Sequence, residues 1–282
     1  MAAALGGRVA LVTGASRGVG KGVATALGES GATVYLTARS VLGEPSATGL
    51  GGTLEETAAA VEQAGGTAVP VRCDHRDDAA VRAVFERIER EHGRLDLLVN
   101  SAWGGYELIH WGDYEGFAAP FWEQPVELWD SMFAAGVRAA YAASAEAARL
   151  MVVRGSGLID NVSFFAGQRY HQNVAYGVAK AATDRLTADA AVELREHGVA
   201  VVSLYPGLVR TEGVLRWAEL VDLSNSESPE FVGRAVVALA TDPDFLRLSG
   251  EVVVAAELAE EYGFTEADGS RPASVRRAFE VA

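Results

Sequence analysis

The sequence predicts an α/β fold in which buried strands alternate with amphipathic helices. Seven short runs are rich in Val, Leu and Ile, and segments long enough for helices separate them. Strands buried on both faces read as continuous apolar runs, which is typical of a parallel sheet covered by helices. The first run, residues 8–13, leads directly into a glycine-rich turn and then into a helical pattern through Leu27. We therefore expect a doubly wound, mostly parallel seven-stranded sheet.

The remaining elements follow in the same alternation. The predicted strands cover residues 8–13, 33–37, 67–73, 95–99, 157–162, 199–205 and 251–255. After the first helix, further helices are predicted over 54–64, 79–91, 126–151, 173–194 and 232–240. Thr53 and Glu56 have the spacing of a capping box at the start of one helix, and Gly136 interrupts the helix 126–151.

Composition and charge favour a soluble, cytoplasmic protein whose 282 residues form one domain. The net charge of −14 argues against nucleic acid or an anionic membrane as partner. No apolar run approaches the ~20 residues of a membrane span, and residues 1–7 lack the pattern of a signal peptide. Cys73 is the single cysteine, so no intrachain disulfide is possible. We find no cluster of residues with metal-ligand spacing.

The glycine turn, residues 14–20, predicts a phosphate-binding site. Its glycines, Gly14, Gly18 and Gly20, stand between a predicted strand and a predicted helix. Such glycines permit a tight turn and close approach of a pyrophosphate, while the helix amino terminus offers free N–H groups. A glycine-rich turn alone is weak evidence. In this position, dinucleotide binding is the better interpretation.

Two arginines favour NADP(H) over NAD(H). In dinucleotide-binding folds, an acidic residue near the end of the second strand binds the ribose 2′-hydroxyl, whereas arginine accommodates a 2′-phosphate. Ala38 stands at the expected acidic position, and Arg39 follows it. Arg17 adds a second cation with a planar fork of donors. The alternative is that both arginines are ordinary surface residues.

Tyr176 and Lys180 are a candidate acid–base pair. Residues four apart lie on one face of a helix. A charged Lys180 would favour the phenolate of Tyr176 and lower its pKa from about 10. A phenol tuned in this way can exchange a proton with a carbonyl or hydroxyl oxygen. The spacing is common, however, and by itself also fits an ordinary solvated helix face.

The segment 103–125 is rich in aromatic residues. Because ligands bind beyond the carboxyl ends of parallel strands, where this segment emerges, it could wall an apolar and flat substrate. The alternatives are a small core of its own or a subunit contact. Its aromatic residues are Trp103, Tyr106, Trp111, Tyr114, Phe117, Phe121 and Trp122. Residues 212–231 are expected to form a second substrate-side loop, and 257–282 a polar tail of uncertain order.

Taken together, these motifs resemble the short-chain dehydrogenases/reductases. The resemblance rests on motifs that occur together over about 200 residues. In chain order they are TGASRGVG at 13–20, Asp74, Asn100, the Ser163, Tyr176 and Lys180 set, and the Pro206-Gly207 pair. The strings GATVYLTAR, VAYGVAKAATD and VSLYPGLVRTE are similar to those of the dehydrogenase/reductase family member 1 subgroup. The resemblance implies a single Rossmann-type domain and hydride transfer between a nicotinamide and a carbonyl or alcohol carbon. It also implies a homodimer or homotetramer.

The resemblance assigns roles to individual residues. Tyr176 would be the general acid in reduction, Ser163 would bind the substrate oxygen, and Lys180 would bind the nicotinamide ribose. Trp103 and Phe165 would contact the substrate. The expected cofactor-binding residues are Gly14, Ser16, Arg17, Gly18, Val19, Gly20, Arg39, Asp74, Asn100, Tyr176, Lys180, Pro206, Gly207, Val209 and Thr211.

The chain departs from the family pattern at three places. Gly136 stands where members carry an asparagine that completes a water-mediated proton relay with the lysine. Ser163 is followed by two phenylalanines rather than a second serine, although it keeps the spacing of thirteen residues to Tyr176. The carboxyl-terminal strand also lacks the usual glycine pair and has residues 255–257 (AAE) instead.

We expect an NADPH-dependent reductase of apolar ketones or aldehydes. An NAD-dependent alcohol dehydrogenase of the same fold is the first alternative. A non-catalytic NADPH-binding sensor or scaffold is the second, and Gly136 is its only support.

Overall fold

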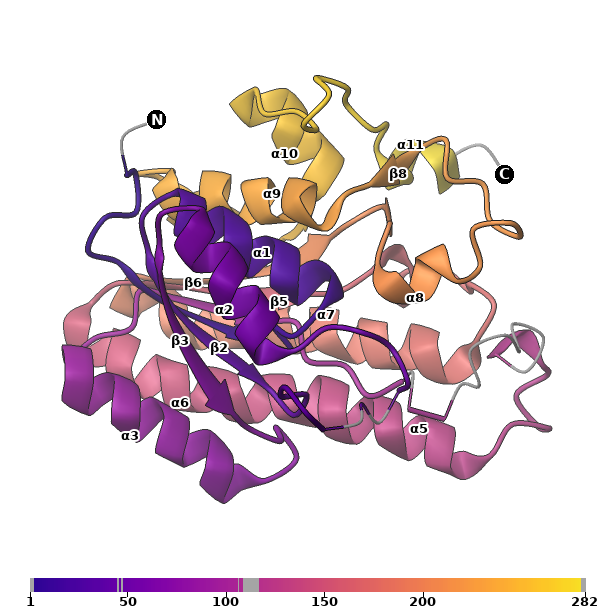
Figure 1. The fold of residues 1–282 in the computed structure, drawn as a ribbon, viewed down its shortest axis with the longest axis horizontal. Helices are drawn as coiled ribbons and strands as arrows, with labels where there is room; N and C mark the ends of the chain where they lie inside the picture. The colour runs from indigo at the N-terminus through magenta and orange to yellow at the C-terminus, as the bar shows by residue number, and fades with distance from the viewer. Residues whose placement is uncertain (1–2, 45, 47, 106, 109–116, 280–282) are drawn as a thin grey trace.

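A seven-stranded parallel sheet is the centre of the computed structural model (Figure 1), which describes residues 3–279 apart from 45, 47, 106 and 109–116. The strand order is β3-β2-β1-β4-β5-β6-β9, and every neighbouring pair in it is parallel. The strands are β1 Val9–Thr13, β2 Thr33–Ala38, β3 Thr67–Arg72, β4 Leu97–Asn100, β5 Gly157–Val162, β6 Val199–Tyr205 and β9 Val252–Val254. The predicted α/β class and Rossmann-type doubly wound sheet are confirmed, and the sheet is wholly parallel rather than mostly so.

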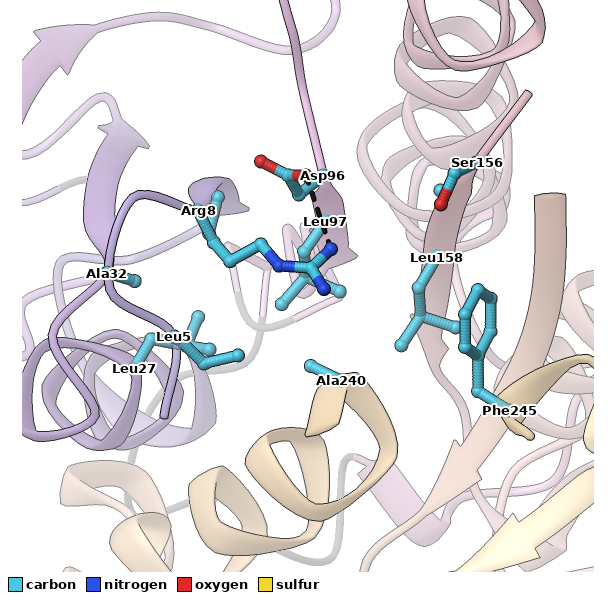
Figure 2. A pocket seen from close by; sticks show the side chains of 12 residues that line it. Leu5, Arg8, Leu27, Ala32, Asp96, Leu97, Ser156, Leu158, Ala240 and Phe245 are labelled. Atoms are coloured by element: carbon cyan, nitrogen blue, oxygen red, sulfur yellow. Dashed lines mark hydrogen bonds and ion pairs between the residues drawn. The ribbon is translucent and has the colours of Figure 1, made fainter. Parts of the chain in front are cut away.

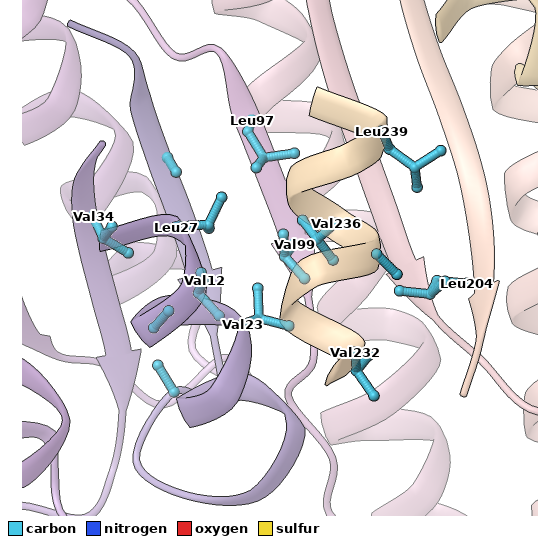
Figure 3. Close-up of a cluster of buried hydrophobic side chains, with 14 of the residues drawn as sticks. Val12, Val23, Leu27, Val34, Leu97, Val99, Leu204, Val232, Val236 and Leu239 are labelled. Carbon is cyan, nitrogen blue, oxygen red and sulfur yellow. The ribbon is translucent and has the colours of Figure 1, made fainter. Parts of the chain in front are cut away.

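Helices cover both faces of the sheet. One face packs against α1 Gly18–Glu29, α2 Leu54–Gln63 and α9 Pro229–Thr241, and their buried Val, Leu and Ala side chains form the larger core (Figure 3). The other face packs against α3 Asp78–His92, α6 Ala139–Arg154 and α7 Val174–Leu194. Both faces are therefore apolar, which explains the continuous apolar runs in the sequence.

Polar side chains cap the amino termini of two helices and thereby define where these helices begin. Thr53 accepts the backbone N–H of Glu56 at 3.2 Å and caps α2, as the capping-box spacing predicts. Asn173 caps α7 in the same way, accepting the N–H of Tyr176 at 2.9 Å. The cap thus places Tyr176 in the first turn of its helix.

The interruption predicted at Gly136 is a π-helical turn. Helix α5 Val126–Met132 passes into the π turn η1 Phe133–Arg138 and then into α6. Such turns insert one residue into a helix and often occur at functional sites. Here the inserted turn carries Gly136.

The last part of the described chain packs onto the fold. Helix α10 Ala255–Tyr262 begins directly after β9, so the predicted strand 251–255 is shortened at its end. Leu258 and Ala259 of α10 join the larger core, and Ser274 and Val275 are also buried. The short helix α11 Val275–Phe279 follows, so the described part of the predicted tail contains most of α10 and all of α11.

The remaining elements are short. They are the 3₁₀ turns η2 Phe165–Gly167, η3 Arg195–His197 and η4 Phe245–Leu248, helix α8 Glu212–Leu215, and the paired strands β7 Leu208–Val209 and β8 Ser226–Glu227. In Figure 1, α5, α8 and β8 gather at one end of the sheet. No helix among the described residues is long and apolar enough to span a bilayer.

A small cavity of about 20 Å³ lies at the opposite end, where β4 and β5 begin (Figure 2). Arg8 and Asp96 form an ion pair in its wall at 3.4 Å, and the other lining side chains are mostly apolar. That volume holds about one water molecule. This cavity is too small for a substrate.

Candidate active site

Strand β5 and helix α7 bring together the three residues predicted to be catalytic. Ser163 follows the last residue of β5, while Tyr176 and Lys180 occupy the first two turns of α7. The Lys180 ammonium donates to the carbonyl of Val162 at 3.2 Å and lies 5.7 Å from the centre of the Tyr176 ring. The Ser163 hydroxyl is 3.4 Å from the carbonyl oxygen of Lys180. Ser163 and Lys180 are both buried.

Trp103 packs against the ammonium group of Lys180. Its indole ring lies under the ammonium, with Nζ 4.5 Å from the ring centre, and meets the Tyr176 ring edge-on at 5.6 Å. A cation over an aromatic face is attracted by the ring quadrupole. The same indole fills the space beside Gly136, because a Cβ added there would lie 2.8 Å from two ring carbons. An indole therefore occupies the region beside the residue where family members carry an asparagine.

Burial lowers the pKa of Lys180 to about 8, and the negative charge of Asp184 acts in the opposite direction. Desolvation disfavours the ammonium, whereas a nearby carboxylate favours it. Near neutral pH the side chain is therefore mostly charged, with a pKa close to the working range of a proton-transfer site. Sequence reasoning missed Asp184, although it stands four residues after Lys180.

Aromatic rings surround Tyr176 on several sides. Besides Trp103, Phe117 and Phe164 each lie 6.1 Å from its ring centre. Phe165, one of the two predicted substrate residues, is buried in a cluster with Tyr205 and other apolar residues. Phe164, the residue before it, is an aromatic neighbour of Tyr176 that the sequence analysis did not single out.

The other aromatic residues of 103–125 divide into two groups. Phe121 and Trp122 are 60% and 72% exposed and pack edge-on against each other at 5.5 Å. Tyr106, Trp111 and Tyr114 lie outside the described residues.

The glycine turn forms an anion-binding cradle at the start of α1. The N–H of Gly18 donates to the Glu212 carboxylate at 2.9 Å, and Arg17 at the N-cap supplies no side-chain cap. A Cβ on Gly14 would lie 2.8 Å from the backbone of Ala102, so only glycine fits this approach. Ser16 is buried in the same turn, and Val19 packs partly against the larger core. A carboxylate is already held where the helix dipole favours negative charge.

Both predicted phosphate-binding arginines have protein partners. Arg17 donates to the carbonyl of Gly51 at 2.8 Å and to the Ser40 hydroxyl at 2.8 Å, so it anchors the loop after β2. Burial lowers the pKa of Arg17. Arg39 forms an ion pair with Glu107 at 2.6 Å. Glu107 was not foreseen, because nothing local in the sequence indicates which cation it would meet.

Asp74 follows β3, whereas Asn100 ends β4, and β2 and β1 lie between these two strands. Asp74 pairs with Arg76 at 2.6 Å, and Arg76 in turn reaches Glu107 at 3.3 Å. Asn100 donates to Asn161 at 2.8 Å, while its own Oδ1 is buried without a hydrogen-bond partner in the described structure. A buried, unpartnered acceptor costs free energy unless a ligand or water satisfies it. The structure thus offers an acceptor where a cofactor hydroxyl could donate.

The predicted residues after β6 form the loop that leads to α8. Thr211 caps α8 by accepting the N–H of Val214 at 3.3 Å, and Val209 lies buried in β7. Pro206 and Gly207 precede β7, and a Cβ on Gly207 would lie 2.9 Å from the Glu227 carboxylate. Burial raises the pKa of Glu227 to about 7. Glu227 is a buried acid that the sequence alone did not single out.

These features fit a nicotinamide nucleotide. The amino terminus of α1, which here binds the Glu212 carboxylate, could bind the pyrophosphate of such a cofactor. The unpartnered oxygen of Asn100 could accept a hydrogen bond from one of its hydroxyls. The chain belongs to the short-chain dehydrogenase/reductase family, since the family model described as short chain dehydrogenase matches residues 8–219. It is accordingly an NAD(P)-dependent oxidoreductase that acts on CH–OH or C=O groups of a small molecule.

Named relatives agree with this class. Dehydrogenase/reductase SDR family member 1 of Mus musculus and of Homo sapiens are each 44% identical over 95% of this chain and 86% of their own length. Cis-4-hydroxycyclohexanecarboxylate dehydrogenase of Sinomonas cyclohexanicum is 31% identical over 94% of this chain and 99% of its own.

Solved structures share the fold. A metagenomic short-chain oxidoreductase in complex with NADP superposes with a TM-score of 0.70 at 31% identity, over 89% of this chain and 97% of that one. A dehydrogenase from Xanthomonas campestris gives a TM-score of 0.78 at 25% identity, over 95% and 93% of the two chains.

Proposed function

We propose that this protein is an NADPH-dependent reductase of apolar ketones or aldehydes, with Tyr176 as the proton donor. The observation that carries the proposal is the enclosed Lys180 ammonium, 5.7 Å from the Tyr176 ring centre and 4.5 Å from that of Trp103. A cation held at this distance stabilises a phenolate. A bound nicotinamide nucleotide supplies the hydride.

The chain's own residues would position the substrate oxygen and move one proton. Tyr176 donates its phenolic proton to that oxygen as it gains negative charge, and Lys180 stabilises the phenolate that remains. Ser163, at the end of β5, binds the same oxygen. The rings of Trp103, Phe117 and Phe164 around Tyr176 exclude water and favour an apolar substrate.

Tyr176→Phe tests the proposal, because it removes one oxygen and keeps the ring packing. We expect turnover of a panel of apolar and cyclic carbonyl compounds to fall at least about a hundredfold, in line with the loss of a general acid. NADPH binding, measured by fluorescence titration, is expected to change little. The matched control is Tyr170→Phe, since Tyr170 is 75% exposed. Retention of most activity in Tyr176→Phe would contradict the assignment and favour the sensor or scaffold alternative.

The preference for NADPH rests on Arg39 and Arg17 at the end of β2. Arg39 is held by Glu107 and remains 33% exposed at its side chain. A 2′-phosphate carries more charge than a carboxylate and can compete for the guanidinium fork. Dissociation constants for NADPH and NADH decide this point, since tighter NADH binding would favour the NAD-dependent alternative.

We also propose that two copies of this chain pair through the outer surface of α5, η1, α6 and α7. A hollow there is lined by Phe133, Val137, Tyr141 and Leu186, and Tyr141 is 62% exposed. Exposed apolar surface of this kind is typical of subunit contacts. Sedimentation of wild type and of Tyr141→Arg would test the pairing, and a wild-type monomer would exclude it.

A further inference from the structure

Asp184 is a partly buried acid that the catalytic assignment does not use. It lies one turn beyond Lys180 on α7 and faces the sheet. Its carboxylate accepts a hydrogen bond from the Ser203 hydroxyl at 2.8 Å and another from the Tyr205 hydroxyl, both on β6. Two hydroxyls of one strand thus hold this carboxylate.

The backbone makes room for this carboxylate. A Cβ added to Gly167, in the turn η2, would lie 2.5 Å from the Asp184 Oδ2 atom. The fit leaves Asp184 little freedom to turn away from β5 and β6.

In the described part of the chain, few charged groups lie around Asp184. On its own helix the facing group is Lys180; on β6 it is Tyr205, whose surroundings also include Arg276 near the carboxyl terminus. β5 and η2 contribute Ser163 and Gly167, neither of which carries charge. Around Lys180, the segment after β4 contributes the face of Trp103, and β5 contributes the carbonyl of Val162. Arg138 of η1 is turned to Asp78 on α3 instead.

Building on the proposed function, we propose that Asp184 is a positioning residue: its hydroxyl-held carboxylate is the counter-charge that keeps the buried Lys180 an ammonium beside Tyr176. Burial raises the pKa of Asp184, while the hydroxyls of Tyr205, Ser163 and Ser203 and the charge of Lys180 act to lower it. The hydroxyls thereby favour the ionised carboxylate. Asp184 acts on Tyr176 only through Lys180.

The sequence makes this effect directly measurable, because the chain contains two lysines, Lys21 and Lys180. Protein labelled with ¹³C-lysine gives two sets of side-chain signals, and both can be titrated without cofactor or substrate. In the wild type we expect the Lys180 signal to titrate at a pKa of about 8. Asp184→Asn is expected to lower that pKa by about one unit, because it removes a carboxylate one turn away. Lys21 serves as the internal reference.

Two further variants separate a charge effect from a packing effect. Asp189→Asn removes an exposed acid from the same helix, where it pairs with Arg185, and should leave the Lys180 titration unchanged. Tyr205→Phe keeps the ring but removes one donor to Asp184. The carboxylate then protonates more readily, so the pKa of Lys180 should fall by less than in Asp184→Asn. If Asp184→Asn fails to fold, Tyr205→Phe still tests the direction.

The pH dependence of the reduction rate should shift together with the pKa of Lys180. As Lys180 loses its charge at a lower pH, the alkaline fall in reduction rate should shift down by the same amount in Asp184→Asn. An unchanged Lys180 pKa in a folded Asp184→Asn variant, or an equal change in Asp189→Asn, would overturn the inference. A shifted Lys180 pKa together with full activity of Tyr176→Phe would instead overturn the proposed function and leave this inference standing.

Discussion

The indole of Trp103 and the bare backbone of Gly136 are complementary. Two carbons of the ring come within 2.8 Å of the point where a Cβ on Gly136 would lie, and the ring then continues beneath Lys180. The two residues are 33 positions apart, one after β4 and the other in the π turn. The indole of Trp103 can therefore occupy this position only because residue 136 has no side chain.

Restoring the family asparagine should be costly only while the indole is present. Gly136→Asn places side-chain atoms in occupied space, and overpacking of this kind costs about 1–3 kcal/mol of unfolding free energy. In a Trp103→Ala background the same change should cost much less. Urea unfolding of both single variants and the double variant gives the coupling energy, which we expect to be about 0.5–3 kcal/mol. Additive effects would show that the two residues do not compete for one space.

The Glu212 carboxylate and a cofactor pyrophosphate compete for the start of α1. Glu212 accepts the N–H of Gly18 at 2.9 Å, so binding a phosphate there means displacing it. Glu212→Gln weakens this contact, and the loss of a charge at a helix terminus is worth about 0.3–1 kcal/mol. We therefore expect NADPH to bind about two- to fivefold more tightly by fluorescence titration.

Glu219→Gln is the matched control for that variant, because Glu219 is exposed and follows α8 in the same loop. Unchanged or weaker NADPH binding in Glu212→Gln would show that the carboxylate does not oppose the cofactor.

Asp160 makes the fold less stable as the pH rises. It lies fully buried on β5 with both oxygens unpartnered in the described structure, and burial raises its pKa to about 8. Between its unfolded pKa of about 4 and the folded value, the native state holds a proton that the unfolded state has lost. Stability therefore decreases across that range.

Asp160→Asn removes this titration. We expect it to be more stable than the wild type at pH 8 by at least about 1 kcal/mol, with a smaller difference at pH 5. Urea unfolding over this range measures the effect. Asp189→Asn should follow the wild-type curve, and a pH-independent difference for Asp160→Asn would contradict the assignment.

The sheet could be predicted from the sequence because its signature is local. The strands other than the edge strand β3 are largely buried, and the glycine turn stands directly between β1 and α1. The pairing of Tyr176 with Lys180 follows from helical spacing. The structure places both residues on α7 and Ser163 directly after β5.

The contacts that modify the site are not local. Glu212 lies 194 residues from Gly18, and Glu107 lies 68 residues from Arg39. The partner of each carboxylate depends on the tertiary arrangement of segments that are far apart in the sequence. The hydrophobic periodicity of the sequence does not predict that arrangement. The early end of β9 has a simpler cause: Ala255 and Ala256 are good helix formers, and α10 starts with them.

The π turn between α5 and α6 sets the rotation of the packing face of α5 relative to the packing face of α6. Leu128 and Met132 of α5 pack with Ala175 and Ala179 near Tyr176, whereas the alanine face of α6 packs in the core beneath β4 and β5. Removing one residue from Phe133–Arg138 would give a regular helix and rotate one face by about 100° against the other. The orientation of α5 beside Tyr176 and the packing of α6 on the sheet are therefore coupled through the π turn. A change in the length of this turn would alter one of them relative to the other.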